Sequence, residues 1–291
     1  MTWREAVERA SNALRAAGVE DAKVNAEYLA SHVLGLKRKS EIRSYFHSNL
    51  SYDEEQVFQQ LVDRRIEREP LQYILGEWEF FGLPIKVTPA ALIPRPETEV
   101  LVEESLKEAA SFDRPISILD IGTGSGAIAL ALAARLPRAY ILGIDSSAAA
   151  IGLANENKRL LPLANVDFHR VDSTWSDWTT WLRNERKFDL VVSNPPYVSL
   201  DEFQQLEPEL RRYEPRQALT DESTGLTFYE RIARVAPGLL ASRGRLLVEL
   251  GYKEEEAVLV IMQSNGLEVT RVVNDLDGIP RVLVAYRLGG S

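Results

Sequence analysis

The chain has 291 residues, a net charge of −9, a hydrophobic fraction of 45% and no cysteine. This length suggests one large or two ordinary domains with a substantial core. The lack of cysteine excludes disulfides, thiolate metal sites and a cysteine nucleophile. The three histidines, His32, His47 and His169, have no ligand-like spacing, so we predict no metal site. The acidic balance disfavours a nucleic acid partner, because polyanion binding normally needs a basic face.

The sequence gives no sign of a membrane segment. The apolar run from Ala127 to Ala134 has eight residues, well short of a membrane span. The first residues lack a secretory apolar region, and Glu5 and Glu8 argue against an organellar transit peptide. We therefore expect a cytoplasmic protein without membrane contact.

Residues 1–75 are predicted to form a small helical bundle. Apolar residues recur at helical spacing from Trp3 to Ala17, and Ser51 with Glu54 fits the capping box that starts a later helix. The segment holds 11 Lys/Arg and 12 Asp/Glu, a net charge of −1 that leaves −8 for the rest of the chain. It carries no catalytic motif. It is either a packing module or, as we favour, a substrate-docking domain beside the predicted catalytic mouth.

Residues 76–91 are predicted to form a β-hairpin that links two domains. Aromatic and β-branched residues such as Trp78, Phe80 and Ile85 lie on both sides of Gly82, a pattern typical of a hairpin.

Residues 92–291 alternate between strand-like and helix-like patterns. The predicted strands are residues 116–121, 140–145, 166–171, 188–193, 245–250, 267–273 and 281–286. Such alternation favours a parallel, doubly wound sheet, with the last strands paired in antiparallel fashion. The fold class is thus α/β, a Rossmann-like seven-stranded domain preceded by a small helical bundle.

A glycine-rich loop follows the first of these strands and opens a helix. It consists of Gly122, Thr123, Gly124, Ser125 and Gly126. Glycines allow a sharp turn and close approach of a ligand to the main chain. A dinucleotide loop has the spacing G-x-G-x-x-G, whereas this tighter G-x-G-x-G after Asp120 is more like a loop for S-adenosylmethionine. A tight turn without a ligand is the alternative.

Asp145 ends the second strand of this domain, 19 residues after Gly126. A carboxylate at about this distance from a glycine loop can accept hydrogen bonds from ribose hydroxyls. It could also cap the following helix, and the two roles are compatible.

The third strand of the domain is followed by Asp172 and Ser173, which are predicted to lie at the adenine edge of the cofactor. Trp175 could cover the adenine ring, with Trp178 and Trp181 as alternatives. Each of these tryptophans could instead be a packing residue.

The tetrapeptide Asn194-Pro195-Pro196-Tyr197 directly follows the apolar run 188–193. It therefore leaves the carboxyl end of a buried strand, where open α/β sheets bind ligands. The prolines stiffen the turn, Asn offers a side-chain carbonyl and Tyr a flat ring. Such a site can hold a planar NH2 group, as methylation of an amide or an aromatic amine requires.

A mechanism follows as a hypothesis. Asn194 Oδ1 and the Pro195 carbonyl would accept hydrogen bonds from the two N–H groups of an amide. They would thereby direct the lone pair of the amide nitrogen at the methyl donor. Tyr197 would pack on the amide plane, and no general base is evident. The alternatives are methylation of exocyclic amines of nucleic acid bases, a nicotinamide-dependent oxidoreductase and a non-enzymatic S-adenosylmethionine sensor.

Taken together, these motifs resemble the peptide-chain-release-factor glutamine methyltransferases, the PrmC/HemK family. The resemblance covers nearly the whole chain. Besides the glycine loop, Asp145 and the Asn-Pro-Pro-Tyr motif, it rests on Leu-Gln-Tyr-Ile-Leu-Gly at 71–76, Leu-Ile-Pro-Arg-Pro-Glu-Thr-Glu at 92–99, Tyr-Glu-Pro at 213–215 with Ala-Leu at 218–219, and Glu-Leu-Gly at 249–251. The chain departs from the family in one place, because Ser173 and Thr174 stand where members often have tryptophan directly after the acid.

The resemblance implies that S-adenosylmethionine is the cofactor and that the substrate is the glutamine of a Gly-Gly-Gln motif in a translation release factor. We expect no direct contact with nucleic acid and a monomeric enzyme. Arg95 and Glu97 are expected either to line the mouth of the cofactor pocket or to brace the proline-rich loop through ion pairs. Glu249 could be structural.

Overall fold

The computed structural model describes residues 1–171 and 187–287, which divide into two compact units. The helical unit consists of Met1–Glu77 with Glu207–Tyr213, and the α/β unit of Trp78–Leu206 with Glu214–Ser291. None of the helices in the described residues has both the length and the apolar character that crossing a membrane requires.

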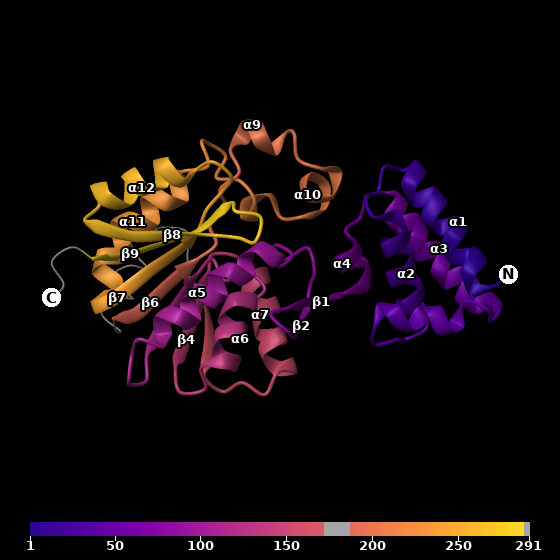
Figure 1. Cartoon of the computed structure of the whole chain (residues 1–291), viewed down its shortest axis with the longest axis horizontal. Coiled ribbons are helices and arrows are strands. Elements are labelled where there is room, and N and C mark those ends of the chain that lie inside the picture. Colours follow the sequence, from indigo (N-terminus) through magenta and orange to yellow (C-terminus); the bar gives the residue numbers. More distant parts are fainter. Residues whose placement is uncertain (172–186, 288–291) are drawn as a thin grey trace. The chain divides into compact units, whose positions relative to one another are not determined.

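The helical unit contains five helices and a 3-10 segment among the residues described. They are α1 (Trp3–Ala16), α2 (Ala22–Val33), η1 (Lys39–Tyr45), α3 (Tyr52–Ile66), α4 (Leu71–Leu75) and α10 (Pro208–Tyr213) (Figure 1). The predicted capping box is confirmed at the start of α3, where Ser51 and Glu54 bond each other's backbone N–H. The ring of Trp3 packs edge-on against Phe58, with 5.5 Å between the ring centroids.

Residues 207–213 belong to the helical unit although they follow the predicted catalytic strand in sequence. Glu209 pairs with Arg65 at 2.9 Å and with Arg68 at 2.5 Å. The Tyr213 hydroxyl donates to the Glu67 carbonyl at 2.8 Å. The predicted domain divisions at residues 75 and 91 stay predictions, and these contacts add a segment that the sequence did not single out.

The α/β unit contains a two-stranded sheet and a seven-stranded sheet. The small sheet is β1 (Glu77–Phe80) with β2 (Leu83–Lys86). The strands of the large sheet are β3 (Ser117–Ile121), β4 (Tyr140–Asp145), β5 (Val166–Arg170), β6 (Phe188–Ser193), β7 (Leu240–Glu249), β8 (Leu267–Asn274) and β9 (Pro280–Arg287). The other described elements are η2 (Pro96–Thr98), α5 (Glu99–Ala109), α6 (Ala127–Arg135), α7 (Ala148–Leu160), α9 (Leu200–Phe203), η3 (Arg216–Ala218), α11 (Thr227–Leu239) and α12 (Glu255–Ser264).

The strand order in the large sheet is β5-β4-β3-β6-β7-β9-β8. The chain runs outward from β3 through β4 to β5, then returns to β6 beside β3, so the order reverses between β3 and β6. Both pair in parallel, with Ile121 opposite Ser193. In such sheets the ligand lies outside the carboxyl ends of the strands at this reversal. β9 pairs antiparallel with both β7 and β8. The predicted fold class and the antiparallel end of the sheet are confirmed.

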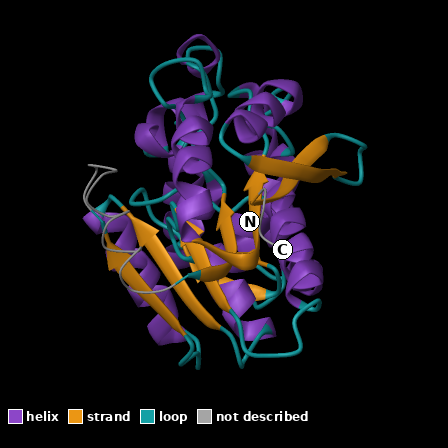
Figure 2. Ribbon diagram, turned by 90° about the vertical axis from the view of Figure 1, so that its left-hand side faces the viewer, coloured by secondary structure: helices purple, strands orange, loops and turns teal. Residues whose placement is uncertain are grey.

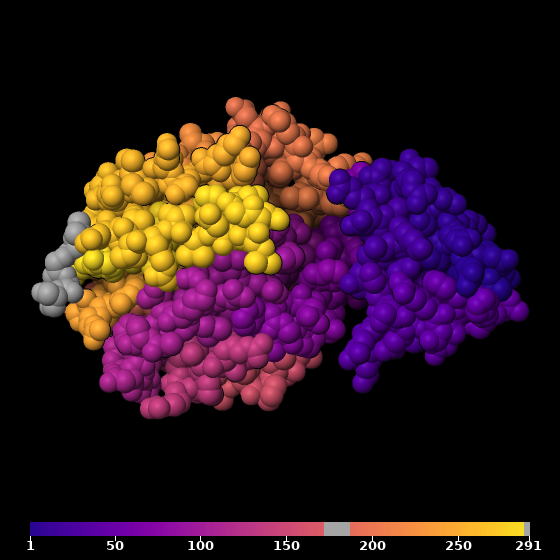
Figure 3. Space-filling model, in the orientation of Figure 1, coloured from indigo at the N-terminus to yellow at the C-terminus, as the bar shows by residue number. Residues whose placement is uncertain are grey.

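Helices cover both faces of the large sheet (Figure 2). α5 and α11 each contact β6, β7 and β9 but lie on opposite faces, α5 beside α6 and α11 beside α12 (Figure 1). Ion pairs fasten α5 to the sheet, since Arg271 of β8 bonds Glu104 at 2.8 Å and Glu108 at 2.7 Å. The magenta and yellow segments accordingly adjoin on the surface of this unit (Figure 3). These contacts make a rigid base for the loops at the carboxyl ends of β3, β4 and β6.

Candidate active site

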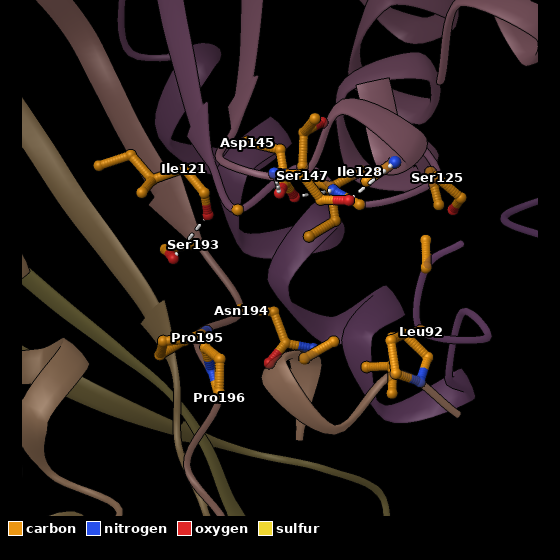
Figure 4. Close-up of a pocket in the computed structure, with 18 of the residues that line it drawn as sticks. Leu92, Ile121, Ser125, Ile128, Asp145, Ser147, Ser193, Asn194, Pro195 and Pro196 are labelled. Carbon is orange, nitrogen blue, oxygen red and sulfur yellow. Dashed lines mark hydrogen bonds between the residues drawn. The ribbon is translucent and has the colours of Figure 1, made fainter. Parts of the chain in front are cut away.

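A cavity of about 310 Å³ opens at the carboxyl ends of β3, β4 and β6. Its walls come from the glycine-rich loop, the start of α7, the segment after β6, the loop before α5, and α11. In Figure 4, Asp145 and Ser147 lie on one side of the opening, and Asn194, Pro195 and Pro196 on the opposite side. The two main predicted motifs therefore face one space, of the size usual for small-molecule sites.

Backbone contacts hold the glycine-rich loop in place. Gly122 N and Thr123 N both donate to the Ile144 carbonyl at 2.9 Å. Gly126 has φ +83°, and a Cβ there would lie 2.8 Å from Phe168 Cζ. Only glycine suits that position, since a side chain would meet both the left-handed backbone and the Phe168 ring. The first four residues of the loop line the cavity, whereas Gly126 does not.

A buried asparagine anchors the same loop from behind. Asn157 of α7 is fully buried, and its Nδ2 donates to the Ser125 carbonyl at 2.9 Å and to the Lys86 carbonyl at 3.1 Å. Its Oδ1 accepts from Lys86 N at 2.8 Å. The hydrogen bond to Ser125 is buried and those to Lys86 are partly buried, so together they hold the loop to β2 and α7.

Asp145 lines the cavity with its carboxylate already oriented. Oδ2 accepts from Gly124 N at 3.0 Å, and Oδ1 accepts from Ser147 N at 2.9 Å. Burial raises the pKa of the Asp145 carboxyl, although hydrogen bonds from Ser147, Gly124 and Ser146 oppose the rise. Each carboxylate oxygen has a second lone pair, so the group can still accept from a ligand hydroxyl.

Asp120 lies under the loop and outside the cavity lining. Its Oδ2 accepts from the Thr123 hydroxyl at 2.7 Å, and its Oδ1 has no hydrogen-bond partner among the described residues. Burial, with a smaller contribution from the charge of Asp145, raises the pKa of the Asp120 carboxyl to about 7. Its contact with Thr123 makes it a support for the loop.

The segment after β6 is tied to its neighbours on two sides. The Ser193 hydroxyl donates to the Ile121 carbonyl at 2.8 Å, which joins the ends of β6 and β3 (Figure 4). Asn194 Nδ2 donates to Thr98 Oγ1 at 3.0 Å. Within the described residues, Asn194 Oδ1 has no hydrogen-bond donor. Asn194 therefore lines the cavity with an acceptor available.

Tyr197 does not line the cavity. Its hydroxyl lies 3.4 Å from Glu249 Oε1, to which it donates. A Cβ on Gly251 would lie 3.0 Å from Tyr197 Cδ2, so the glycine lets the ring pack against the chain after β7. Burial, reinforced by the charge of Glu249, raises the pKa of Tyr197. The predicted packing of Tyr197 on a substrate amide stays a prediction.

Arg95 lines the cavity and also braces the proline-rich loop. It forms an ion pair with Glu214, whose Oε2 accepts from Ile93 N at 3.1 Å. Arg95 therefore has both of the roles left open by the sequence, because it lines the cavity and also braces the proline-rich loop. Glu97 is exposed and does not line the cavity, whereas Glu249 is 1% exposed.

Sequence reasoning missed part of the wall. Four further residues line the cavity, Gln217 of η3 and Phe228, Arg231 and Ile232 of α11. No motif distinguished them from other helix residues. The predicted adenine-edge residues Asp172 and Ser173, and the predicted stacking residue Trp175, lie outside the described residues.

Two family models match the chain, the PrmC N-terminal domain over residues 5–76 and the methyltransferase small domain over residues 97–207. The release factor glutamine methyltransferase of Geobacter sulfurreducens is 41% identical over 99% of this chain and 97% of its own length. The chain belongs to the release factor glutamine methyltransferase family.

A human protein and a solved structure are also similar to the chain. The human MTRF1L release factor glutamine methyltransferase is 37% identical over 94% of this chain and 83% of its own length. Among solved structures, the release factor-specific protein-(glutamine-N5) methyltransferase of Alicyclobacillus acidocaldarius matches 70% of this chain and 99% of its own, at 30% identity and a TM-score of 0.41.

The family member described here is a methyltransferase, and its cofactor is S-adenosylmethionine. The cavity residues fit that group. The loop of Gly122 and Gly124 leaves the main chain open to a ligand, and Asp145 offers acceptors for ribose hydroxyls. Asn194 lies across the cavity from Asp145, where a substrate could meet the methyl group (Figure 4).

Proposed function

We propose that this enzyme methylates the side-chain amide nitrogen of the glutamine in the Gly-Gly-Gln motif of translation release factors. The observation that carries the proposal is the hydrogen bond from Asn194 Nδ2 to Thr98 Oγ1. It leaves Oδ1 as an acceptor at the edge of the cofactor cavity. Family membership supports the substrate, since the relatives are named for it.

The chain's contribution to the reaction is orientation. An amide nitrogen is a weak nucleophile because its lone pair is delocalised into the carbonyl. Asn194 Oδ1 and the Pro195 carbonyl accept hydrogen bonds from the two N–H groups of the substrate amide. This orientation turns the nitrogen lone pair toward the cofactor. Alignment of the reacting atoms supplies much of the rate, and the acceptors stabilise positive charge that develops on nitrogen.

When bound, S-adenosylmethionine supplies an electrophilic methyl group. The nitrogen lone pair would accept this methyl group, the sulfonium sulfur would keep the electrons of its bond to the methyl carbon, and the nitrogen would lose one proton. Pro195 and Pro196 stiffen the segment that carries the acceptors. In this proposal Tyr197 packs on the amide plane.

The remaining site assignments are part of the proposal. The loop 122–126 holds the methionine moiety, Asp145 the ribose hydroxyls, and Asp172 with Ser173 the adenine edge. Residues 1–75 form the docking domain for the release factor, and residues 76–91 link it to the methyltransferase domain 92–291. The enzyme works as a monomer in the cytoplasm, where release factors act, and does not bind nucleic acid directly.

Mass spectrometry tests the proposal. A purified bacterial release factor is incubated with the enzyme and S-adenosylmethionine and then digested. We expect the mass of one added methylene on the Gly-Gly-Gln peptide and on no other peptide. A release factor with Glu in place of the glutamine serves as the control. No gain on the wild-type peptide, or an equal gain on the control, refutes the proposed substrate.

A further inference from the structure

The chain that leaves the Asn-Pro-Pro-Tyr motif runs along a second stretch of the α/β unit, residues 219–227, which we call the bracing loop. Val198 N donates to the Leu219 carbonyl at 2.9 Å, and Leu200 N donates to the Ser223 carbonyl at 3.0 Å. The residues directly after the motif are therefore paired with this loop. The position of the motif's carboxyl end depends on the shape of the loop.

The bracing loop also touches the backbone of the motif itself. Gly225 is buried and has φ +88°. A Cβ at this position would lie only 2.3 Å from the Tyr197 carbonyl oxygen and 2.8 Å from Glu254 Oε1. Glycine is required here, because a side chain would push the Tyr197 carbonyl away.

Asp221 fixes the shape of the bracing loop. Its Oδ1 accepts from Ser223 N at 2.8 Å and from Gly225 N at 2.9 Å, and its Oδ2 accepts from Thr227 N at 2.9 Å. Burial acts to raise the pKa of the Asp221 carboxyl, but hydrogen bonds from Thr227, Gly225 and Ser223 outweigh it, so the pKa is lowered. A single carboxylate thus binds three main-chain N–H groups, one of them on the glycine that touches the motif.

The bracing loop leads into α11, one of the walls of the cavity. Thr227 is the first residue of this helix, so the Asp221 carboxylate also satisfies an N–H group that has no partner within the helix. The helix is held independently by its buried face, which includes Tyr229, Ala233 and Leu239. Loss of the Asp221 carboxylate should therefore loosen the loop and leave the α11 wall of the cavity in place.

We propose that Asp221 is a positioning residue, which shapes the bracing loop and thereby holds the Asn-Pro-Pro-Tyr motif in the alignment that methyl transfer needs. Asp221 does not line the cavity and acts through the loop. The hydrogen bonds of Ser193 and Asn194 fix only the amino end of the motif. The proposal rests on the proposed function, because it assumes that the Pro195 carbonyl, two residues before Tyr197, holds the substrate amide.

The first test compares turnover with binding in Asp221→Ala. Misalignment of an acceptor acts on the transition state, so we expect kcat to fall about tenfold while KM for the release factor and affinity for S-adenosylmethionine stay within about twofold. Asp221→Asn keeps one carbonyl oxygen, whose two lone pairs can serve Ser223 N and Gly225 N. This variant should recover most of the lost turnover.

Asn165→Ala is the matched control for Asp221→Ala. Asn165 Nδ2 donates to three main-chain carbonyls, those of Ala133, Leu136 and Ala139, at 3.3, 3.0 and 3.1 Å. Its substitution removes as many hydrogen bonds between side chain and main chain, but next to the amino ends of β4 and β5, at the edge of the sheet opposite the cavity. We expect kcat of Asn165→Ala to equal that of the wild type.

The second test is Gly225→Ala, which places a methyl group against the Tyr197 carbonyl and should lower kcat at least as much as Asp221→Ala does. Gly278→Ala is its control. Gly278 has a similar φ of +81°, but a Cβ there would have nothing within 4 Å. The pair therefore separates contact with the motif from backbone strain, and kcat of Gly278→Ala should stay at the wild-type value.

The two proposals fail separately. If the wild-type enzyme does not methylate Gly-Gly-Gln, the proposed function is wrong. If it does, but Asp221→Ala and Gly225→Ala keep the wild-type kcat or lose no more than their controls, the positioning role is wrong and the function stands. A change confined to KM or to cofactor affinity also contradicts the positioning role. Should one of the two alanine variants fail to fold, the other decides.

Discussion

Arg65 and Glu209 form a buried ion pair inside the helical unit. Arg65 Nη2 lies 2.9 Å from Glu209 Oε1, and the two side chains are 8% and 11% exposed. Burial acts to raise the pKa of the Glu209 carboxyl, but hydrogen bonds from Arg68 and Arg65 outweigh it, so the pKa is lowered. The segment around Glu209 is thus bound to the first 77 residues by charges that have little access to water.

We predict that Glu209→Ala strongly destabilises the helical unit. The substitution leaves the buried Arg65 guanidinium without its carboxylate, and breaking such a pair from one side costs about 3–5 kcal/mol. Chemical denaturation of the full chain measures the change. Glu55→Ala is the control, because the Arg9–Glu55 pair is exposed and 3.8 Å long, and we expect a change of less than ~1 kcal/mol there. Equal effects of the two substitutions would contradict the prediction.

We predict that Asp145→Ala lowers affinity for S-adenosylmethionine about tenfold or more. A charge-assisted hydrogen bond contributes about 1.5–3 kcal/mol, and the substitution also removes the acceptor for Gly124 N and Ser147 N. Calorimetry of cofactor binding measures the change. Asp167→Ala is the control, since Asp167 pairs with Lys158 at 3.0 Å and does not line the cavity. Unchanged affinity of Asp145→Ala would remove this carboxylate from the cofactor site.

We predict that deleting residues 1–72 lowers activity on an intact release factor and leaves cofactor binding largely unchanged. All described residues that line the cavity lie after residue 79. The deletion also removes Arg65 and Arg68, so it should be made with Glu209→Gln to avoid an unpaired carboxylate. A short Gly-Gly-Gln peptide serves as the control substrate. If the truncated enzyme methylates the intact factor at the full-length rate, residues 1–72 are not a docking domain.

The fold was predictable because its signals are local. β6 is buried along its whole length, and apart from Asp189 and Ser193 its residues are apolar. β7 was predicted to begin at residue 245, but it begins at Leu240. Its first half contains Ser242, Arg243 and Gly244, and its register with β6 shifts between Phe188 and Leu190. Polar residues at an irregular pairing leave no alternating pattern, so that half of the strand could not be found.

The site was predictable only where a motif lies within a few residues of sequence. The glycine-rich loop and Asn194 are of this kind, because the residue types next to one another in the sequence indicate their chemistry. The contact of Asn194 with Thr98 joins residues 96 positions apart. The cavity face of α11 carries Phe228, Arg231 and Ile232, residue types that occur in any packed helix. Tertiary packing determines both the contact and the cavity face of α11, and packing between distant residues cannot be read from a single sequence.

We predict that Asn194→Ala reduces turnover about 100- to 1000-fold, the usual cost of removing one preorganised polar contact to a developing charge. Among the described residues, neither the glycine-rich loop nor Asp145 has a hydrogen bond to the Asn194 side chain. The fold should therefore persist, and cofactor affinity should change much less than catalysis. Asn155→Ala is the matched control, because Asn155 bonds the Ile151 carbonyl within α7 and does not line the cavity.

Single-turnover methyl transfer at saturating cofactor and release factor separates the chemical step from binding. A well-folded Asn194→Ala enzyme within about threefold of the wild-type rate would rule out the proposed role of Asn194 Oδ1 as an acceptor for the substrate amide, because the loss is expected at the chemical step itself.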